Sequence, residues 1–150
     1  MSDVTVVGGG LAGCEAALQL AGTGHSVRLV EMRPERGTEA HQSDRLGELV
    51  CTNSFKSEAP ENAHGQLKRE MRSLGSVLLR SADATKVAAG SALAVDRHLF
   101  AAAMMDAVES EPAIEIVREE CSVIPDGPTI IATGPLTSGA LYKSIESALG

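Results

Sequence analysis

Three glycines near the start of the chain are spaced for contact with a phosphate. Gly8, Gly10 and Gly13 follow the apolar run Val4–Val7. In this pattern the first glycine permits a sharp turn, the second lets a pyrophosphate approach the backbone, and the third lets the next helix pack closely on a sheet. The N–H groups and positive dipole end of that helix then face the phosphates. We therefore expect a dinucleotide to bind along Gly8, Gly9, Gly10, Leu11, Ala12 and Gly13.

An acidic residue stands at the end of the next apolar stretch. Val27–Val30 is expected to form a strand that ends beside Glu31, whose carboxylate would accept hydrogen bonds from ribose hydroxyls. The glycine pattern alone is weak evidence, but the strand, helix and acid together form its supporting context. The alternative is a tight strand-to-helix turn without a ligand. Glu31 would repel a 2′-phosphate, whereas Arg33 could contact one, and Arg33 is included in the predicted cofactor site.

A second glycine-containing segment follows a later apolar run. Thr129–Ala132 is expected to be a strand, which would place Thr133 and Gly134 at the carboxyl edge of a sheet, where ligands bind in open α/β folds. Together with the glycine turn, this segment favours FAD as the dinucleotide. The alternative is an ordinary strand-to-helix turn punctuated by Gly134 and Pro135.

Cys51 is the candidate reactive side chain. It lies in a loop-rich insertion, residues 32–65, and long ordered loops tend to carry function. A nucleophilic thiol must be accessible and its thiolate stabilised; the alternative is a buried, inert cysteine. His41, in the same insertion, is either an acid–base group, a phosphate contact or a solvated loop histidine.

The rest of the chain alternates between helical and strand-like patterns. We expect helices over 12–22, 66–81, 97–110 and 139–149, and strands over 91–95, 114–118 and 129–132. A hairpin partner is expected at 121–124, which would place Cys121 in a strand. Four residues at helical spacing are assigned to the core: Leu67, Met71, Leu74 and Leu78. This order predicts an α/β, Rossmann-like FAD-binding domain of the glutathione-reductase type, a parallel sheet with an antiparallel excursion.

Composition narrows the possible classes of protein. We expect the 150 residues to form one domain. The net charge of −7 argues against a nucleic-acid partner, but residues 28–97 hold 11 of the 13 Lys and Arg against 10 acids, compatible with a local anion-facing surface. The alternative, which composition alone favours, is a solvated surface of mixed charge. No run is long enough to cross a bilayer, no signal peptide is recognisable, and the three cysteines form no pairing or metal pattern. We expect a cytoplasmic protein without a membrane partner or a metal.

Several longer motifs resemble those of the bacterial folate- and FAD-dependent tRNA (uracil-5-)-methyltransferases. The resemblance covers nearly the whole chain and is strongest in residues 6–17, Glu31–Pro34, Leu49–Ser54, Ala94–Arg97 and Ala132–Ser138. It implies that the glycine turn, Glu31, Thr133 and Gly134 hold FAD and that Cys51 is catalytic. In that family FAD is reduced by NAD(P)H, and a one-carbon unit from 5,10-methylenetetrahydrofolate is passed to C5 of the T-loop uridine of tRNA, giving ribothymidine.

The resemblance also implies that this chain is the amino-terminal part of a longer enzyme. We expect most of the folate- and tRNA-binding region to lie beyond residue 150 and these residues alone to lack methyltransferase activity. One alternative is the related FAD enzyme that installs carboxymethylaminomethyl groups on wobble uridine, in which a glycine-rich Cys-Asn-Pro segment is expected in place of Cys51–Ser54. The others are a generic FAD oxidoreductase and a non-catalytic, truncated FAD-binding module.

Overall fold

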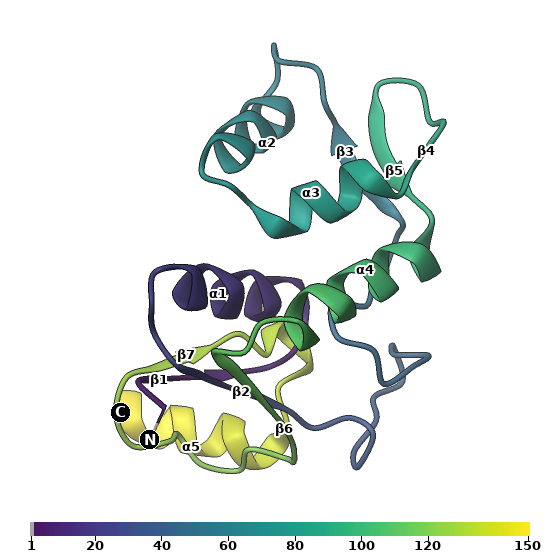
Figure 1. Ribbon diagram of the computed structural model, residues 1–150. Helices are drawn as coiled ribbons and strands as arrows, with labels where there is room; N and C mark the ends of the chain where they lie inside the picture. The colour runs from purple at the N-terminus through teal and green to yellow at the C-terminus, as the bar shows by residue number, and fades with distance from the viewer. Residues whose placement is uncertain (1) are drawn as a thin grey trace.

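A four-stranded parallel sheet forms the base of the fold in the computed structural model, which describes residues 2–150 (Figure 1). Its order is β6-β2-β1-β7, built from β1 (Val4–Val7), β2 (Val27–Glu31), β6 (Ile114–Arg118) and β7 (Thr129–Ile131). The chain moves outward from β1 to β2 and β6, then returns to the other side of β1. In this topology the carboxyl ends of β1 and β7 border the crevice in which doubly wound folds bind ligands.

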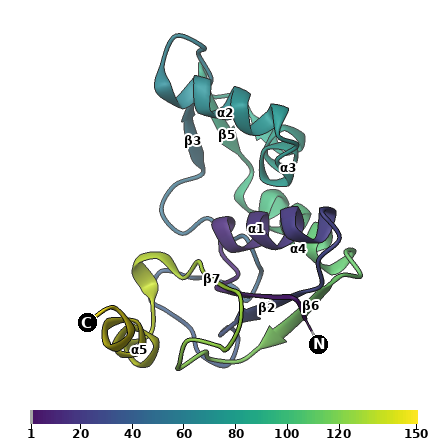
Figure 2. The same cartoon turned by 90° about the vertical axis from the view of Figure 1, so that its left-hand side faces the viewer.

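Helices cover both faces of this sheet. Helices α1 (Leu11–Gly22) and α4 (Arg97–Glu109) lie on one face, and α5 (Gly139–Leu149) lies on the other (Figures 1 and 2). The side chain of Asp96 caps α4 by accepting hydrogen bonds from two backbone N–H groups of its first turn. The buried face of α1 carries only small residues, which lets this helix lie close to the strands.

A second, antiparallel sheet lies beyond α1 and α4 (Figure 2). Its order is β3-β5-β4, formed by β3 (Ser54–Ser57), β5 (Ala92–Val95) and β4 (Lys86–Val87). Helices α2 (Ala63–Ser73) and α3 (Val77–Ala84) connect β3 to β4. The contacts between this layer and α1 and α4 include a hydrogen bond from the Leu78 N–H to Glu15 Oε2 at 2.8 Å, and the edge-to-face packing of the rings of Phe55 and Phe100, 5.4 Å apart.

One hydrophobic core runs from the parallel sheet into the second layer. The fully buried residues at its centre come from β1, α1, β2, the insertion, β5 and α4: Val6, Cys14, Ala17, Leu29, Leu46, Leu93, Val95, Phe100 and Met104. Leu46 brings the insertion into this core, so the segment after β2 is packed against the sheet rather than free in solvent.

The expected helix over residues 66–81 is wrong as a single element. The chain forms α2 and α3, separated at Leu74–Ser76, because Gly75 takes a φ of +77° and Ser76 caps α3. The break turns the two halves of the apolar stripe in different directions. Leu78 is buried, but Leu67 and Leu74 are exposed, so their assignment to the core is also wrong.

The antiparallel strands are not where the sequence pattern puts them. Residues 121–124 form no strand, so Cys121 lies in a loop after β6. The antiparallel pairing involves β3, inside the predicted loop-rich insertion, and β5, which pairs there and not in the parallel sheet. The parallel sheet itself is confirmed, as are the helices near 12–22, 97–110 and 139–149 and the strands near 27–30, 114–118 and 129–132.

Replacing Gly13 with alanine should destabilise the fold strongly. A Cβ atom at this position would lie 1.7 Å from the Gly8 carbonyl oxygen, which is backbone and cannot rotate away. We expect the free energy of unfolding in urea to fall by about 3 kcal/mol, the upper end of the usual cost of overpacking. Gly22→Ala is the matched control, because Gly22 lies in the same helix and its added Cβ meets nothing within 4 Å. It should raise the stability by up to about 1 kcal/mol; equal effects of the two substitutions would show that the close approach of α1 to Gly8 does not limit stability.

Candidate functional site

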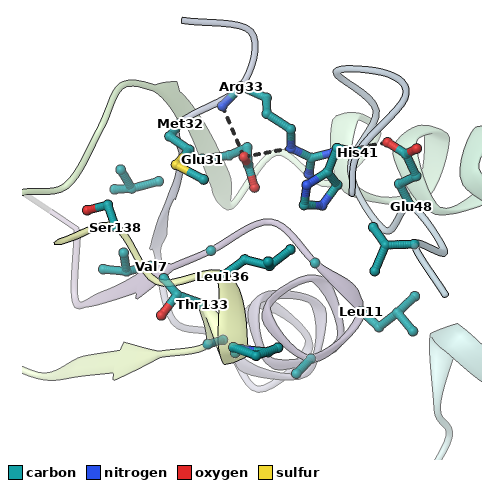
Figure 3. Close-up of a pocket in the computed structure, with 18 of the residues that line it drawn as sticks. Val7, Leu11, Glu31, Met32, Arg33, His41, Glu48, Thr133, Leu136 and Ser138 are labelled. Carbon is teal, nitrogen blue, oxygen red and sulfur yellow. Dashed lines mark hydrogen bonds and ion pairs between the residues drawn. The ribbon is translucent and has the colours of Figure 1, made fainter. Parts of the chain in front are cut away.

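A cavity of about 440 Å³ opens at the carboxyl edge of the parallel sheet. Five separate parts of the chain line it, as Figure 3 shows in part: the glycine turn, the end of β2, the insertion, the segment after β6 and the segment after β7. The predicted site residues on its wall are Gly8, Gly10, Leu11, Ala12, Glu31, Arg33, Cys51, Thr133 and Gly134. The fold thus brings the predicted cofactor residues and the candidate thiol to one cavity.

Gly8 and Gly13 lack a side chain for steric reasons within the protein, whereas Gly10 does not. Gly8 has a φ of +105°, and a Cβ there would lie 2.8 Å from the carbonyl oxygen of Ala132. Gly13 allows α1 to approach that turn. A Cβ on Gly10 would meet no atom within 4 Å, so the space beside Gly10 is open for a ligand. Gly9 and Gly13 are not among the cavity-lining residues and instead contact other parts of the protein: Gly9 lies against Leu46 and Glu31, and Gly13 against Gly8.

The start of α1 is suited to an anion. Gly10 is its N-cap and offers no side chain, and no acidic residue occupies the first turn. The first N–H groups of a helix have no partner within the helix, and they carry the positive end of its dipole. With the open space at Gly10, these donors form a cradle of the size and charge that a pyrophosphate requires. The residues present therefore fit FAD.

Glu31 faces this cradle and is held in place by hydrogen bonds. Its Oε2 accepts from the N–H of Gly9 at 2.8 Å, and its Oε1 accepts from both the backbone N–H and the Nε of Arg33, at 3.0 and 2.8 Å. Burial acts to raise the pKa of Glu31, but the bonds from Arg33 and Gly9 outweigh it, so the pKa lies below its ordinary value. The carboxylate is therefore ionised at neutral pH and can accept from ribose hydroxyls.

Arg33 is buried between two carboxylates. Its side chain is 2% exposed; Nε pairs with Glu31, while Nη1 donates to Glu48 at 3.2 Å and to the backbone carbonyls of Ser43 and Arg45. In Figure 3 the three charged side chains of Glu31, Arg33 and Glu48 point toward one another beside the cavity. Arg33 does line the cavity, but its Nε and Nη1 groups already donate to protein acceptors, and one of these acceptors is Glu31.

Cys51 is exposed and lies on the cavity wall, so the alternative of a buried thiol is wrong. Asn53 anchors the loop that carries Cys51 by two hydrogen bonds to Val95. The side-chain amide of Asn53 donates to the Val95 carbonyl, and the Val95 N–H donates to the Asn53 carbonyl. Cys14 is buried, and burial raises the pKa of its thiol to about 12. Cys121 lines the same cavity, and partial burial raises the pKa of its thiol.

His41 is not the freely solvated histidine allowed for by the sequence. It is half-buried, it lines the cavity, and its Nδ1 lies 2.6 Å from the hydroxyl oxygen of Thr38. Burial lowers the pKa of His41, and the nearby positive charge of Arg33 lowers it further. The imidazole is therefore predominantly neutral at pH 7, which favours a hydrogen-bonding role over attraction of a phosphate.

The segment after β7 closes the other side of the cavity. Thr133 and Gly134 lie where β7 ends, and Gly134, with a φ of +59°, begins a short 3-10 helix, η1 (Gly134–Leu136). The hydroxyl oxygen of Thr133 lies 2.5 Å from that of Thr137, which fixes the Thr133 side chain. Both predicted residues reach the cavity, opposite the insertion.

Sequence reasoning missed two parts of this site. Glu48 is a buried acid whose partners, Arg33 and the backbone at residues 42–43, come together only when the insertion folds back on the sheet. Leu46 and Gly47 pack directly on Gly9, and the Gly47 N–H donates to the Gly9 carbonyl at 2.9 Å. The feature of the sequence that could have indicated this packing is the run Leu46–Val50, which combines apolar residues with one acid inside an otherwise polar insertion.

Two kinds of feature are absent from the part of the chain that the structure describes. Across residues 2–150 there is no group of three or more His, Cys, Asp or Glu placed to hold a metal ion. Over the same range, none of the helices combines the length and the apolar character needed to span a bilayer.

Several solved structures have a similar fold. Aquifex aeolicus GidA in its form I crystal matches 83% of this chain and 20% of its own length, with a TM-score of 0.65 and 23% identity. NikD, described as an unusual amino acid oxidase essential for nikkomycin biosynthesis, matches 95% of this chain and 53% of its own, with a TM-score of 0.59 and 16% identity. These likenesses establish the fold, which is the Rossmann-like fold of FAD-binding proteins.

Curated sequences give a closer likeness. The chain is 57% identical over 150 residues to the methylenetetrahydrofolate–tRNA-(uracil-5-)-methyltransferase TrmFO of Rubrobacter xylanophilus, and 53% identical over 148 residues to the TrmFO of Anoxybacillus flavithermus. It covers 34% of each, so it spans about a third of the length of these relatives. The family described as glucose inhibited division protein A matches residues 3–148. The chain belongs to the glucose inhibited division protein A family.

Proposed function

We propose that this chain supplies the FAD-binding part of a folate-dependent tRNA (uracil-5-)-methyltransferase. The observation that carries the proposal is the shared cavity, which has a dinucleotide cradle on one wall and an exposed cysteine on another. The relatives of that name, of which one is 57% identical over 150 residues and another 53% identical over 148, support it independently. Only the amino-terminal third of such an enzyme corresponds to this chain, so we further propose that turnover requires more protein than residues 1–150.

The proposed cofactor site assigns a role to each part of the cavity wall. Gly10 and the start of α1 would face the pyrophosphate, Glu31 would accept from the ribose hydroxyls, and Thr133 with Gly134 would border the cofactor on the far side. Bound FAD would supply the redox chemistry of the transfer, with NAD(P)H as the reductant and 5,10-methylenetetrahydrofolate as the one-carbon source.

Cys51 would activate the uracil. C5 of uracil is a poor nucleophile until a thiolate adds to C6, which moves electron density onto C5 and lets it form a bond to the one-carbon unit. Loss of the C5 proton would then break the bond between that carbon and its carrier and leave an exocyclic methylene group on C5. A hydride, supplied at the expense of the reductant, would convert the methylene group to methyl, and the C6–S bond would break to return the thiolate. Cys51 is exposed on the cavity wall, and the bonds between Asn53 and Val95 fix the loop that carries it. A thiol in this place would meet a base that enters from solvent.

The second candidate is the related FAD enzyme that modifies wobble uridine. It would use the same cofactor cradle, and family membership alone is compatible with it. The segment Cys51–Ser54 favours the methyltransferase, because a glycine-rich Cys-Asn-Pro segment is expected in the wobble enzyme. In either case the macromolecular substrate is tRNA and the compartment is the cytoplasm. Few aromatic side chains are available here for base stacking, so we place most tRNA contacts outside residues 1–150.

Denaturing the purified protein should release FAD. The released small molecule would be identified by mass spectrometry and by its flavin absorbance. NAD in its place would overturn the methyltransferase assignment in favour of a dehydrogenase-like domain. If no ligand is released, titration of the refolded protein with FAD should give saturable quenching of flavin fluorescence, and a failure to bind would contradict the proposed cofactor site.

Gly10→Ala should weaken FAD binding while leaving the fold intact. The added Cβ meets no protein atom within 4 Å, so it would project into the space proposed for the pyrophosphate. We expect the FAD dissociation constant to rise by at least about tenfold, equivalent to about 1.4 kcal/mol. The control is Gly22→Ala, which adds the same atom to the other end of α1, outside the cavity. An unchanged affinity in Gly10→Ala would show that the pyrophosphate lies elsewhere.

Cys51→Ala should abolish methylation and spare the cofactor. In the full-length protein, ribothymidine formation in tRNA should fall by about a thousandfold or more, the scale on which loss of a nucleophile acts. FAD content, read from the flavin absorbance, should stay at the wild-type level, because no contact of the proposed cradle involves this side chain. Analysis of the nucleosides in the treated tRNA also separates the two candidate functions, since a carboxymethylaminomethyl product would favour the wobble enzyme.

A further inference from the structure

We propose that Glu48 is a positioning residue that couples the nucleotide cavity to the loop carrying Cys51. The inference rests on the proposed function, because it concerns how the cofactor side of the cavity and the side that carries Cys51 are held in fixed positions relative to each other. It assigns to Glu48 no contact with the reacting atoms.

Glu48 is buried, and both of its carboxylate oxygens are occupied. Its side chain is 6% exposed. Oε1 accepts from the N–H of Gln42 at 2.8 Å, and Oε2 accepts from the N–H and hydroxyl of Ser43 and from Nη1 of Arg33. A buried carboxylate with this many donors is costly to move, because each donor would lose its partner away from water. Glu48 therefore fixes the fold of the insertion around itself.

Through Arg33, Glu48 also fixes the acid that faces the ligand. One guanidinium is shared by two carboxylates: Nε bonds to Glu31 at 2.8 Å and Nη1 bonds to Glu48 at 3.2 Å. The guanidinium is rigid and planar, so a shift at one end turns the other. The position of the Glu31 carboxylate, and with it the contact available to a ribose, depends on Glu48.

Along the chain, Glu48 leads directly to the thiol. Cys51 follows it by three residues, and Leu49 between them is buried. The loop is anchored on its far side by the bonds between Asn53 and Val95. Cys51 thus lies between two anchors, of which the first is shared with the cofactor site. Occupation of the cavity and the placement of Cys51 should influence each other, and such a coupling is reciprocal for binding.

The test is Glu48→Gln, which keeps the size of the side chain and removes its charge, compared with Glu39→Gln. Glu39 lies in the same insertion and is exposed, so the control carries the same change of charge. We expect Glu48→Gln to raise the FAD dissociation constant about tenfold, the scale of one charge-assisted hydrogen bond. It should also change the rate at which iodoacetamide alkylates Cys51 in the absence of FAD, followed by peptide mass spectrometry. The control should alter neither quantity, and wild-type values for both in folded Glu48→Gln would overturn the inference.

A double-mutant cycle separates positioning from general loosening of the fold. If Glu48 acts through Arg33 on Glu31, then Glu48→Gln should weaken FAD binding by less than about threefold when Glu31→Gln is already present, because coupled residues are not additive. Full additivity would contradict the proposal.

A milder variant is available if Glu48→Gln does not fold, as judged by thermal unfolding. Ser43→Ala removes a single bond to Glu48, and it should shift the FAD dissociation constant and the alkylation rate of Cys51 in the same direction as Glu48→Gln. If the wild-type protein binds no FAD, both the proposed function and this inference are wrong. If the wild-type protein binds FAD but Glu48→Gln changes neither FAD binding nor the alkylation of Cys51, only the inference is wrong.

Discussion

The close approach of α1 to the turn that precedes it is the constraint on which the rest of the structure depends. The Gly13 backbone lies so near the Gly8 carbonyl oxygen that a Cβ would come within 1.7 Å of it. This contact sets the start of α1 at the carboxyl end of β1, with its free N–H groups facing outward. Because β7 pairs with β1 on the side away from β2, the helix start lies at the mouth of the crevice. The position of the start of α1 on the cavity wall follows from that approach.

The second organising feature is the burial of Arg33 between Glu31 and Glu48. Burying three charged groups is unfavourable unless each is paired and hydrogen-bonded, and here the backbone carbonyls of Ser43 and Arg45 complete the set. The arrangement requires the insertion to fold back over the end of β2. It is therefore better understood as a device that specifies geometry than as a source of stability. The same folding-back brings Leu46 onto Gly9 and leads the chain toward Cys51.

These two features explain how a glycine turn and an exposed thiol come to line one cavity. The parallel sheet supplies rigid strand ends, and the insertion supplies Cys51, whose loop is anchored at Glu48 on one side and at Asn53 on the other. The second sheet contributes to this anchoring through β5, because Val95 in β5 forms both hydrogen bonds with Asn53. The antiparallel layer thus holds the thiol in relation to a parallel-sheet scaffold whose fold is shared with the similar solved structures.

The sequence by itself determined the parts of this protein that depend on local spacing. The turn from Gly8 to Gly13, the strand ending at Glu31, the capped helix after Asp96 and the edge at Thr133 could all be read from neighbouring residues. Tertiary structure decided what depends on distant contacts. A helical stripe does not reveal a break, so the turn at Gly75 and the exposure of Leu67 and Leu74 were missed. The pairing of β3 with β5, the burial of Glu48 and the place of Cys121 on the cavity wall likewise join residues far apart in the chain, where free energy is gained only after folding brings them together.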